Sequence, residues 1–324
     1  MLPVDALHLM IKLKILKGSE KMFMNELVKR RILVTGANGM LGQRTIHFYK
    51  HLDNLEILGT SVEEKPVFSG IDYLSCDLMR RDQIKKVVSD FCPDFIINTA
   101  AFTNVDLSET EREIAWKINV KGVEYLSEAA RAIDTHIIHI SSDYIFDGTN
   151  GPYSEKDKPN PIGYYGRTKL ASENALKISG AIYTILRTNV LYGIADSRPD
   201  FVRWVVKSVR DGNKINIVTD QVNNPTFIDD LVQAISKVSE FKKQGIYNIG
   251  GREFLTRFEF CKIIADVFGL DKSLIKPILT EQLNQKAKRP LKSGLLTLKS
   301  ETELGYKPHT IREALVLMKR ELNL

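Results

Sequence analysis

Ser142, Tyr165 and Lys169 are the side chains of this sequence best suited to proton transfer at a carbonyl group. Tyr165 and Lys169 are four residues apart at the start of a predicted helix, so their side chains lie on one helical face. An ammonium group beside a phenol favours the phenolate, which predicts a lowered pKa for Tyr165. A phenol tuned in this way can exchange a proton with a substrate oxygen near neutral pH. The spacing also arises by chance, so the surrounding elements and motifs must decide.

Apolar segments of strand length alternate with helical patterns from Arg31 onward, and these elements would position the three side chains. The predicted strands cover residues 32–35, 56–60, 95–99, 136–141 and 183–187, and the predicted helices cover 41–49, 83–90, 111–132 and 165–178. Continuous apolar strands separated by helices indicate a parallel sheet with both faces covered. We therefore predict an α/β fold of the Rossmann type, with a doubly wound parallel sheet.

Three glycines follow the first predicted strand directly, in the order Gly36, Gly39 and Gly42. The first permits a tight turn, the second lets a diphosphate approach the start of a helix, and the third lets that helix pack closely on the sheet. A glycine loop at this place predicts a dinucleotide site, and a tight turn without a ligand is the alternative. We expect the dinucleotide to contact Gly36, Asn38, Gly39, Met40 and Leu41.

The end of the second predicted strand decides which dinucleotide the site prefers, because it should reach the adenosine ribose. No acid follows this strand directly to hold a free 2′-hydroxyl, and no arginine is there to hold a 2′-phosphate. Ser61 would tolerate a phosphate at this point, and Lys65 would supply a positive charge. We therefore expect NADP(H) as the cofactor, with NAD(H) as the alternative.

The regular alternation ends after residue 191. The later predicted elements are helices at 201–211, 228–240 and 257–268 and strands at 214–218 and 246–249. We predict a dinucleotide-binding domain over residues 31–190 with returning strands near 214–250, and a mainly substrate-binding lobe over 191–324 that closes a cleft. Residues 1–30 are an N-terminal extension, either a peripheral amphipathic anchor or a stretch upstream of a true start at Met22 or Met24.

Composition and charge argue against several classes of protein. Hydrophobic content of 43% with 27% charged residues is typical of a folded enzyme rather than a disordered chain. Half of the net charge of +6 comes from residues 1–30, and no basic cluster alternates with aromatic residues, so we expect no nucleic-acid partner. The apolar start of the chain is too short and too charged to cross a membrane, so we expect no membrane partner.

Cysteine and histidine usage indicates a reduced protein without a metal site. Cys76, Cys92 and Cys261 are odd in number and far apart, which is typical of free thiols in the cytoplasm. His136 and His139 are three residues apart on a predicted strand, so they point to opposite faces and cannot chelate one metal ion. We therefore expect a cytoplasmic location and no bound metal.

A series of short motifs runs from Arg31 to the C-terminus. In chain order these are TGANGMLG (35–42), DL (77–78), INTAAFTNVD (97–106), INVKG (118–122), SSDYIFDG (141–148), YGRTK (165–169), LRTNVLYG (186–193), TDQVNNPT (219–226), GIYNIGG (245–251) and KRPLKSGL (288–295). Together they resemble the extended short-chain dehydrogenase/reductase superfamily, and more narrowly its dTDP-4-dehydrorhamnose reductase family. So many motifs in one order are specific for that branch and less specific for the sugar.

The resemblance implies a role for each matched residue of the catalytic and cofactor sites. Ser142 would hydrogen-bond the substrate oxygen, Tyr165 would act as the general acid, and Lys169 would hold the nicotinamide ribose and tune Tyr165. Asn119 would orient the active site, or would only pack its helix. The remaining cofactor contacts implied are the adenine pocket and the path of the dinucleotide, formed by Asp77, Leu78, Ala100 and Ala101.

The resemblance also implies a set of substrate-binding residues. Asp143 and Tyr144 would touch the sugar, although Asp143 could equally cap a turn. Arg187, at the end of a strand, would face the cleft with Thr188. The set is completed by Gln221 and by Arg289, which would grip the diphosphate of the substrate.

Two comparisons within the superfamily narrow the reaction. Sugar-nucleotide 4,6-dehydratases carry an Asp-Glu pair after the catalytic hydroxyl, whereas here Tyr144 follows Asp143, which argues against dehydration. The branch has Gly where Asn223 stands and Asn where Lys292 stands, so base or sugar preference could differ. Lys292 would either meet a pyrophosphate or be a solvated surface lysine.

We therefore predict NADPH-dependent reduction of the C4 keto group of a nucleotide-linked 4-keto-6-deoxy sugar, foremost of dTDP-4-dehydro-L-rhamnose to dTDP-L-rhamnose. The protein would be a homodimer, as is common in the superfamily. One alternative is a non-catalytic dinucleotide-binding subunit similar to the β-subunit of methionine adenosyltransferase. Another is a nucleotide-sugar epimerase, which only the branch-specific C-terminal motifs argue against.

Overall fold

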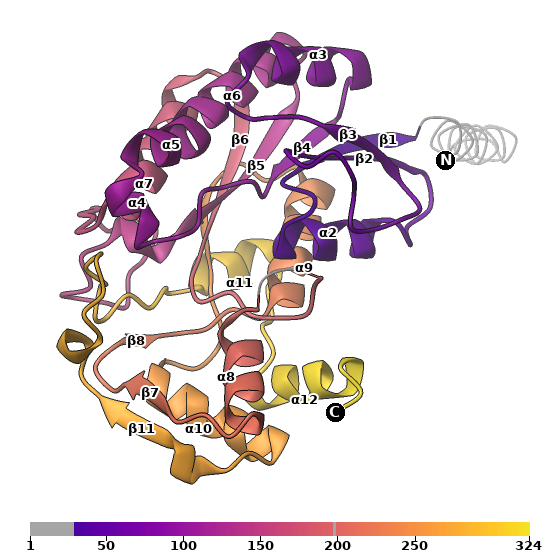
Figure 1. The fold of residues 1–324 in the computed structure, drawn as a ribbon. Helices are drawn as coiled ribbons and strands as arrows, with labels where there is room; N and C mark the ends of the chain where they lie inside the picture. Colours follow the sequence, from indigo (N-terminus) through magenta and orange to yellow (C-terminus); the bar gives the residue numbers. More distant parts are fainter. Residues whose placement is uncertain (1–28, 197–198) are drawn as a thin grey trace, which may run out of the picture.

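A parallel sheet of seven strands lies at the centre of the computed structural model, which describes residues 29–196 and 199–324 (Figure 1). All neighbouring strands in this sheet are parallel. Their order across the sheet is β3 (Asp72–Ser75), β2 (Leu55–Ser61), β1 (Arg30–Thr35), β4 (Phe95–Asn98), β5 (His136–Ser142), β6 (Ile182–Thr188) and β9 (Gly245–Ile249). The predicted doubly wound parallel sheet is confirmed.

Helices cover both faces of the sheet because successive residues of each strand point to opposite sides. In β1, Ile32 and Val34 belong to one buried apolar cluster, whereas Leu33 belongs to the other. One face carries α2 (Met40–Tyr49) and α9 (Ile228–Phe241), and the opposite face carries α3 (Arg81–Phe91), α6 (Gly122–Ala132) and α7 (Tyr164–Ile178) (Figure 1).

The helix predicted at 111–132 is divided into three parts. They are α5 (Arg112–Trp116), the π-helical turn η1 (Lys117–Lys121) and α6. A short helix, α4 (Leu107–Thr110), precedes them. The π turn contains Asn119, and such turns often occur next to functional sites. The local change in helical pitch therefore reorients a residue that the sequence already singled out.

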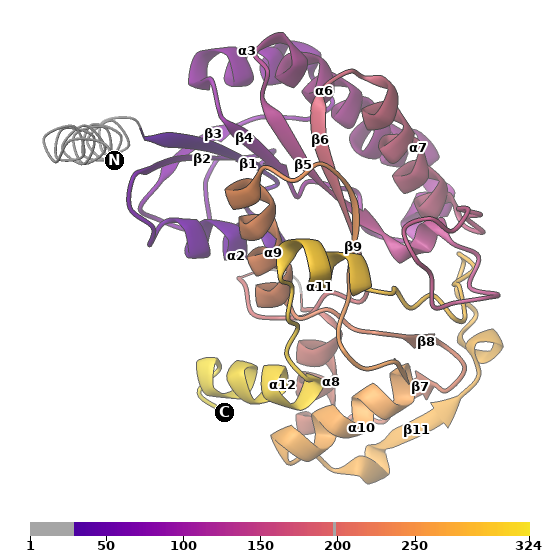
Figure 2. The same cartoon turned by 180° about the vertical axis from the view of Figure 1, so that it is seen from behind.

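The C-terminal lobe combines helices with two small sheets below the main one (Figure 1). β7 (Ile215–Val218) pairs with β11 (Ile275–Ile278), and β8 (Val222–Asn223) pairs with β10 (Leu255–Thr256). The helices associated with the lobe are α8 (Phe201–Arg210), α10 (Arg257–Phe268), α11 (Leu298–Leu304) and α12 (Ile311–Glu321). Viewed from behind, α11 lies beside α9 on the sheet face near β9 (Figure 2).

Of the strands expected to return to the main sheet near 214–250, only β9 does so, by pairing with β6. The expectation for 214–218 was wrong, because β7 pairs with β11 in the lobe. The side chains explain this difference. Asn216 is exposed while Ile215 and Ile217 are buried, so β7 has one covered face, whereas a central parallel strand needs two.

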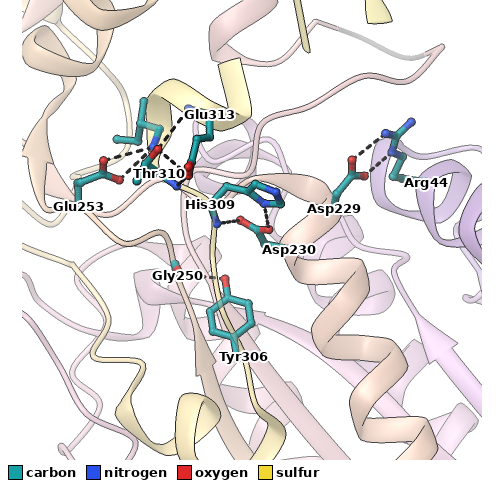
Figure 3. Close-up of polar contacts among 10 residues, drawn as sticks. Arg44, Asp229, Asp230, Gly250, Glu253, Tyr306, His309, Thr310 and Glu313 are labelled. Atoms are coloured by element: carbon teal, nitrogen blue, oxygen red, sulfur yellow. Dashed lines mark hydrogen bonds and ion pairs between the residues drawn. The ribbon is translucent and has the colours of Figure 1, made fainter. Parts of the chain in front are cut away.

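The start of α9 ties the lobe to the sheet layer (Figure 3). Asp229 accepts two hydrogen bonds from Arg44 of α2, and Arg44 also pairs with Glu321 at the end of α12. The next residue, Asp230, accepts from the backbone N–H of His309 at 3.0 Å and from its Nδ1 at 2.6 Å. Asp229 and Asp230 therefore connect α9 both to α2 and to the segment that precedes α12.

Among the described residues, none of the helices is both long and apolar enough to cross a membrane. Residues 1–28 of the expected N-terminal extension lie outside the described part of the chain. Arg30, the last residue of that expected extension, already opens β1 and pairs with Leu55.

Candidate active site

A cavity of about 770 Å³ lies at the carboxyl ends of the central strands, where the lobe meets the sheet. Open parallel sheets bind their ligands at this edge. The lining includes most of the residues predicted from the sequence, from distant parts of the chain. These are Gly36, Gly39, Met40, Leu41, Ser61, Asp77, Leu78, Ala100, Ala101, Ser142, Asp143, Tyr144, Tyr165, Lys169 and Thr188.

Ser142 ends β5, and its hydroxyl is fixed by the turn that follows. Its Oγ donates to Asp143 Oδ1 at 3.0 Å and accepts from the Tyr144 N–H at 3.2 Å. Asp143 is buried and also accepts from Ser293, and burial raises its pKa to about 6. Gly166 lets α7 approach this turn, because a Cβ there would lie 2.0 Å from the Tyr144 carbonyl oxygen. The close approach brings the phenol of α7 to the serine of β5.

Tyr165 lies in the first turn of α7, and its ring meets that of Tyr144 edge to face at 5.6 Å between centroids. Burial raises the pKa of Tyr165, the charge of Asp143 adds to this effect, and the Ser142 hydroxyl opposes it. The predicted lowering of the Tyr165 pKa is therefore wrong, because burial of the phenol is the largest effect on it. The ammonium group of Lys169 donates to the Ile140 carbonyl at 2.7 Å.

Lys169 is 2% exposed, and burial lowers its pKa to about 8. A row of hydrogen bonds reaches it from β1. Thr35 donates to Asn98 Oδ1 at 2.7 Å, which leaves the Asn98 amide N–H to donate to His139 Nδ1 at 3.1 Å. His139 Nε2 then carries the proton and donates to Ser172 at 3.0 Å, whose hydroxyl donates to the Lys169 carbonyl at 2.7 Å.

His139 is neutral in this row, because burial and the charge of Lys169 hold its pKa well below the ordinary value. Lys169 Nζ lies 3.4 Å from the protonated Nε2, so two donors face each other. Only the Ile140 carbonyl accepts from the ammonium among the described residues. His136, three residues earlier in β5, instead contacts Thr184 at 2.8 Å. No group of three His, Cys, Asp or Glu in the described ranges could hold a metal ion.

The glycine loop fits the diphosphate of a dinucleotide. Gly36 has φ of +68°, and a Cβ there would lie 2.6 Å from the Ala100 nitrogen. A Cβ on Gly42 would lie 2.3 Å from the Gly36 carbonyl oxygen. Gly39 is the N-cap of α2, and this described helix start has neither a side-chain cap nor an acid in its first turn. Its first N–H groups and its dipole therefore favour an anion in the cavity.

Asn38, predicted to contact the dinucleotide, is hydrogen-bonded to the segment after β2. Its amide donates to the Lys65 carbonyl at 3.0 Å and accepts from the Val67 N–H at 3.1 Å, so it braces the loop between β2 and β3. Glu63, which no sequence motif marks, lines the cavity. The Ser61 hydroxyl lowers the Glu63 pKa and keeps the carboxylate charged. A carboxylate can accept from a free ribose hydroxyl, so this corner combines a phosphate-tolerant serine with an acid.

Arg187 was expected in the cleft, but the structure places it in a buried ion pair. It is 1% exposed and donates to both carboxylate oxygens of Glu173, at 2.9 and 2.8 Å. Ser141 donates to the same carboxylate at 2.7 Å. Arg187 of β6 faces α7. Its charge is neutralised there by Glu173, which lies one helical turn after Lys169. Gln221 likewise contacts a neighbour, Thr280, at 3.0 Å within the lobe.

Arg289 and Asn119 also have partners in the protein. Arg289 donates to both oxygens of Asp106 at 2.7 Å, and it approaches the hydroxyl of Tyr144. Asn119 contacts the Phe102 N–H at 2.7 Å and Thr168 at 2.9 Å. These contacts agree with the packing alternative for Asn119, which joins the loop after β4 to α7.

Several cavity residues carry no motif that would have drawn attention in the sequence. Arg257 lies at the start of α10, and Phe201 at the start of α8. Only the positions of the lobe helices bring these two residues to Ser142 and Tyr165. Val190, in contrast, lies two residues after β6 within the motif at 186–193, and its φ of +41° is a strained conformation for a β-branched residue.

Comparison with known proteins agrees with this geometry. The sequence model of the family described as RmlD substrate binding domain matches residues 30–324. A dTDP-4-dehydrorhamnose reductase of Aggregatibacter actinomycetemcomitans is 32% identical over 297 residues, which cover 88% of this chain and 97% of that protein. The methionine adenosyltransferase 2 subunit beta of Xenopus tropicalis is 34% identical over 260 residues, with 78% and 76% coverage.

A solved structure extends the comparison to three dimensions. The dTDP-4-dehydrorhamnose reductase of Bacillus anthracis, crystallised in complex with NADP, superposes with a TM-score of 0.82 at 28% identity. The match covers 91% of this chain and 100% of the other. This chain therefore belongs to the RmlD substrate binding domain family, in the dTDP-4-dehydrorhamnose reductase branch of the extended short-chain dehydrogenases/reductases.

Proposed function

We propose that the protein reduces the C4 keto group of a nucleotide-linked 4-keto-6-deoxy sugar, foremost dTDP-4-dehydro-L-rhamnose to dTDP-L-rhamnose. The observation that carries the proposal is the position of Ser142 and Tyr165 in the same cavity as the uncapped start of α2. A hydroxyl, a phenol and a dinucleotide cradle in one cleft are the parts that ketone reduction needs. The protein is an oxidoreductase of nucleotide-sugar metabolism, with a role in polysaccharide biosynthesis.

NADP(H) is the favoured cofactor and NAD(H) the alternative, and the bound cofactor supplies the hydride. Gly36, Gly39 and the first N–H groups of α2 would hold its diphosphate. Asp77 and Leu78 would contact the adenine, and Ala100 and Ala101 would lie along the rest of the molecule.

Ser142 donates its hydroxyl hydrogen bond to the substrate carbonyl oxygen and so polarises it. Tyr165 keeps its proton at neutral pH because burial raises its pKa, and it can pass this proton to the developing alkoxide. Lys169 has an ammonium with a single protein acceptor among the described residues, which leaves N–H groups for a ribose hydroxyl. A hydroxyl has one proton to donate, so Ser142 would release Asp143 Oδ1, 3.0 Å away, when it donates to the substrate.

The test is a reduction assay with purified protein. We expect NADPH to be oxidised when dTDP-4-dehydro-L-rhamnose is added, and the product to be dTDP-L-rhamnose by mass spectrometry and chromatography. A panel of other 4-keto nucleotide sugars defines the sugar and base preference. If no member of this panel is reduced with either NADPH or NADH, the proposed reaction is rejected.

A second candidate function is that of a non-catalytic regulatory subunit. It is favoured by the 34% identity to methionine adenosyltransferase 2 subunit beta over 78% of this chain. In that case the protein would co-purify with a methionine adenosyltransferase and change its kinetics, while the reduction assay would give no turnover. A nucleotide-sugar epimerase would instead interconvert sugars with no net use of NADPH, so chromatography of the sugar products separates it from a non-catalytic subunit.

We also propose that the protein is a cytoplasmic homodimer. The three cysteines are free thiols, as suits a reducing compartment. The apolar residues Ile114, Trp116 and Ile178 are exposed on α5 and α7, with Ile178 86% exposed, and they offer a surface for a second copy. Light scattering combined with size-exclusion chromatography measures the mass, and a monomer at micromolar concentration would contradict the dimer.

A further inference from the structure

Arg257 is the first residue of α10 and lines the substrate end of the cavity with Tyr144 and Phe201. Its guanidinium carbon lies 5.1 Å from the centroid of the Phe201 ring. Tyr144, which feels the charge of Arg257, in turn contacts the ring of Tyr165. Tyr144 therefore lies within electrostatic range of the cation and against the ring of the proposed proton donor.

Among the described residues, none provides a counter-ion in close contact with Arg257. Nearby arginines are neutralised, Arg187 by Glu173 and Arg289 by Asp106. Within residues 29–196 and 199–324, neither a hydrogen bond nor an ion pair engages the guanidinium of Arg257. Burial lowers its pKa, as expected for a cation that has lost water without gaining a partner.

Two acidic groups near Arg257 are engaged elsewhere. Glu259, in the same helical turn, accepts from the N–H and hydroxyl of Thr256 in a capping box. Asp143 lies within electrostatic range, but its oxygens accept from Ser142 and Ser293, and its raised pKa makes it partly protonated near pH 6. Neither acid is therefore a full counter-ion for the guanidinium.

The position of Arg257 in its helix adds a second, independent cost. The start of an α-helix carries a partial positive charge, which disfavours a cation and favours an anion. α10 has 12 residues, so this dipole is well developed. An arginine at this end, without a partner among the described residues, is a local conflict of the kind that marks functional sites. The capping box of Thr256 and Glu259 already satisfies the helix start, so the guanidinium is the group that calls for an anionic ligand.

We propose that Arg257 binds the diphosphate of the nucleotide-sugar substrate and thereby selects nucleoside diphosphate sugars over free sugars. This inference rests on the proposed function, and it reassigns to Arg257 the task that the sequence suggested for Arg289. The planar guanidinium can donate two parallel hydrogen bonds to the phosphates, and the Phe201 ring restricts its orientation. The sugar then lies on the side of Tyr144, Ser142 and Tyr165.

The test is isothermal titration of the NADP⁺-loaded protein with thymidine diphosphate, which carries the anion without a sugar. Arg257→Gln should weaken its binding on the order of 30-fold, and Arg257→Lys should weaken it less, because a charged hydrogen bond is lost in the first and only its geometry in the second. Arg252→Gln, which removes an exposed arginine from the loop before α10, is the matched control and should bind like wild type. The affinity for NADP⁺ should stay within about twofold in all variants, as it reports the folded cofactor site.

Unchanged binding of thymidine diphosphate and uridine diphosphate by Arg257→Gln would overturn the inference. So would an equal loss of NADP⁺ affinity, which would assign Arg257 to the cofactor. A larger loss for a nucleotide uronic acid than for the free diphosphate would assign it to a sugar carboxylate and reject the diphosphate role. Because binding is measured without turnover, a selective loss in Arg257→Gln would support the inference even if the reduction assay failed.

Discussion

The two walls of the cleft differ in how their charges are compensated. The sheet wall is formed by the central strands with α2 and α7, and the lobe wall by the starts of α8 and α10. On the sheet wall, charges are neutralised inside the protein, since Glu173 pairs with Arg187, His139 is neutral and Lys169 donates to a backbone carbonyl. On the lobe wall, Arg257 faces the cavity without a close counter-ion among the described residues. The sheet wall thus pairs its buried arginine inside the protein and leaves the start of α2 and Lys169 for the cofactor, whereas the lobe wall leaves the charge of Arg257 to the substrate.

The sheet wall therefore carries the groups for the reaction, and the lobe wall carries the groups that recognise the substrate. Groups that must hold a proton or a hydrogen bond in one geometry are built into the buried network of β5 and α7. Groups that select the ligand are placed on the starts of the lobe helices, where residues can change without disturbing the sheet. We therefore expect substitutions in the sheet wall to affect rate and stability, and substitutions in the lobe wall to affect substrate binding.

The strongest test of the sheet wall is Tyr165→Phe. Removing the phenolic hydroxyl should lower kcat by about a thousandfold, because proton donation to the alkoxide is lost. The affinity for NADP⁺, measured by fluorescence quenching, should change by less than about twofold, since the cofactor cradle is built from other groups. A comparable loss of cofactor binding would contradict the assignment of Tyr165 as a proton donor.

The buried ion pair of the sheet wall should matter more for stability than the pair on the lobe side. Glu173→Gln leaves the charge of Arg187 buried without its partner, so the free energy of unfolding should fall by about 3 kcal/mol. Asp106→Asn breaks the more exposed pair with Arg289 and should cost about 1 kcal/mol or less. Urea denaturation measures both, and equal losses would remove the distinction between the walls.

Lys169 predicts a pH dependence of stability. Its pKa in the folded chain is about 8, below its ordinary value of 10.5, so between these values the folded state binds fewer protons than the unfolded state. The free energy of unfolding should therefore rise with pH from about 8 to 10.5 through this group, as the cost of the buried ammonium disappears. Lys169→Met should lack this rise.

Urea unfolding of wild type and Lys169→Met without cofactor, at pH 7 and at pH 10.5, tests this prediction. The variant should be the more stable protein at pH 7, and the difference should shrink at the higher pH. A difference that is constant with pH would show that the ammonium is already well compensated in the folded chain.

The smallest expected effect concerns cofactor choice at the edge of the sheet wall. Glu63→Gln removes a carboxylate beside Ser61, so binding of the 2′-phosphate of NADPH should improve relative to NADH by roughly fivefold, about 1 kcal/mol. Glu64→Gln, at an exposed neighbouring position, is the control and should leave the ratio unchanged. The ratio of kcat/KM for the two cofactors is the measurement, and an unchanged ratio would place Glu63 outside the ribose contact.

Much of the sheet wall could be predicted from the sequence because its signals are local. Apolar runs separated by helical periods predicted the central strands, and the glycine loop indicated the start of α2. The rule that parallel strands present their carboxyl ends at one edge then brought Ser142 and the glycine loop together. The π turn at 117–121 could not be predicted, because one extra residue in a turn leaves the apolar period almost unchanged.

The chain by itself determined the parallel sheet, the dinucleotide cradle and the serine, tyrosine and lysine that face it, because each depends on neighbours close in sequence. The tertiary structure alone decided which charges are satisfied. Arg187 meets Glu173 and Arg289 meets Asp106, whereas Arg257 meets no acid in the described ranges. Counter-ions come from segments far apart in the chain, and only the fold brings them within reach or keeps them away.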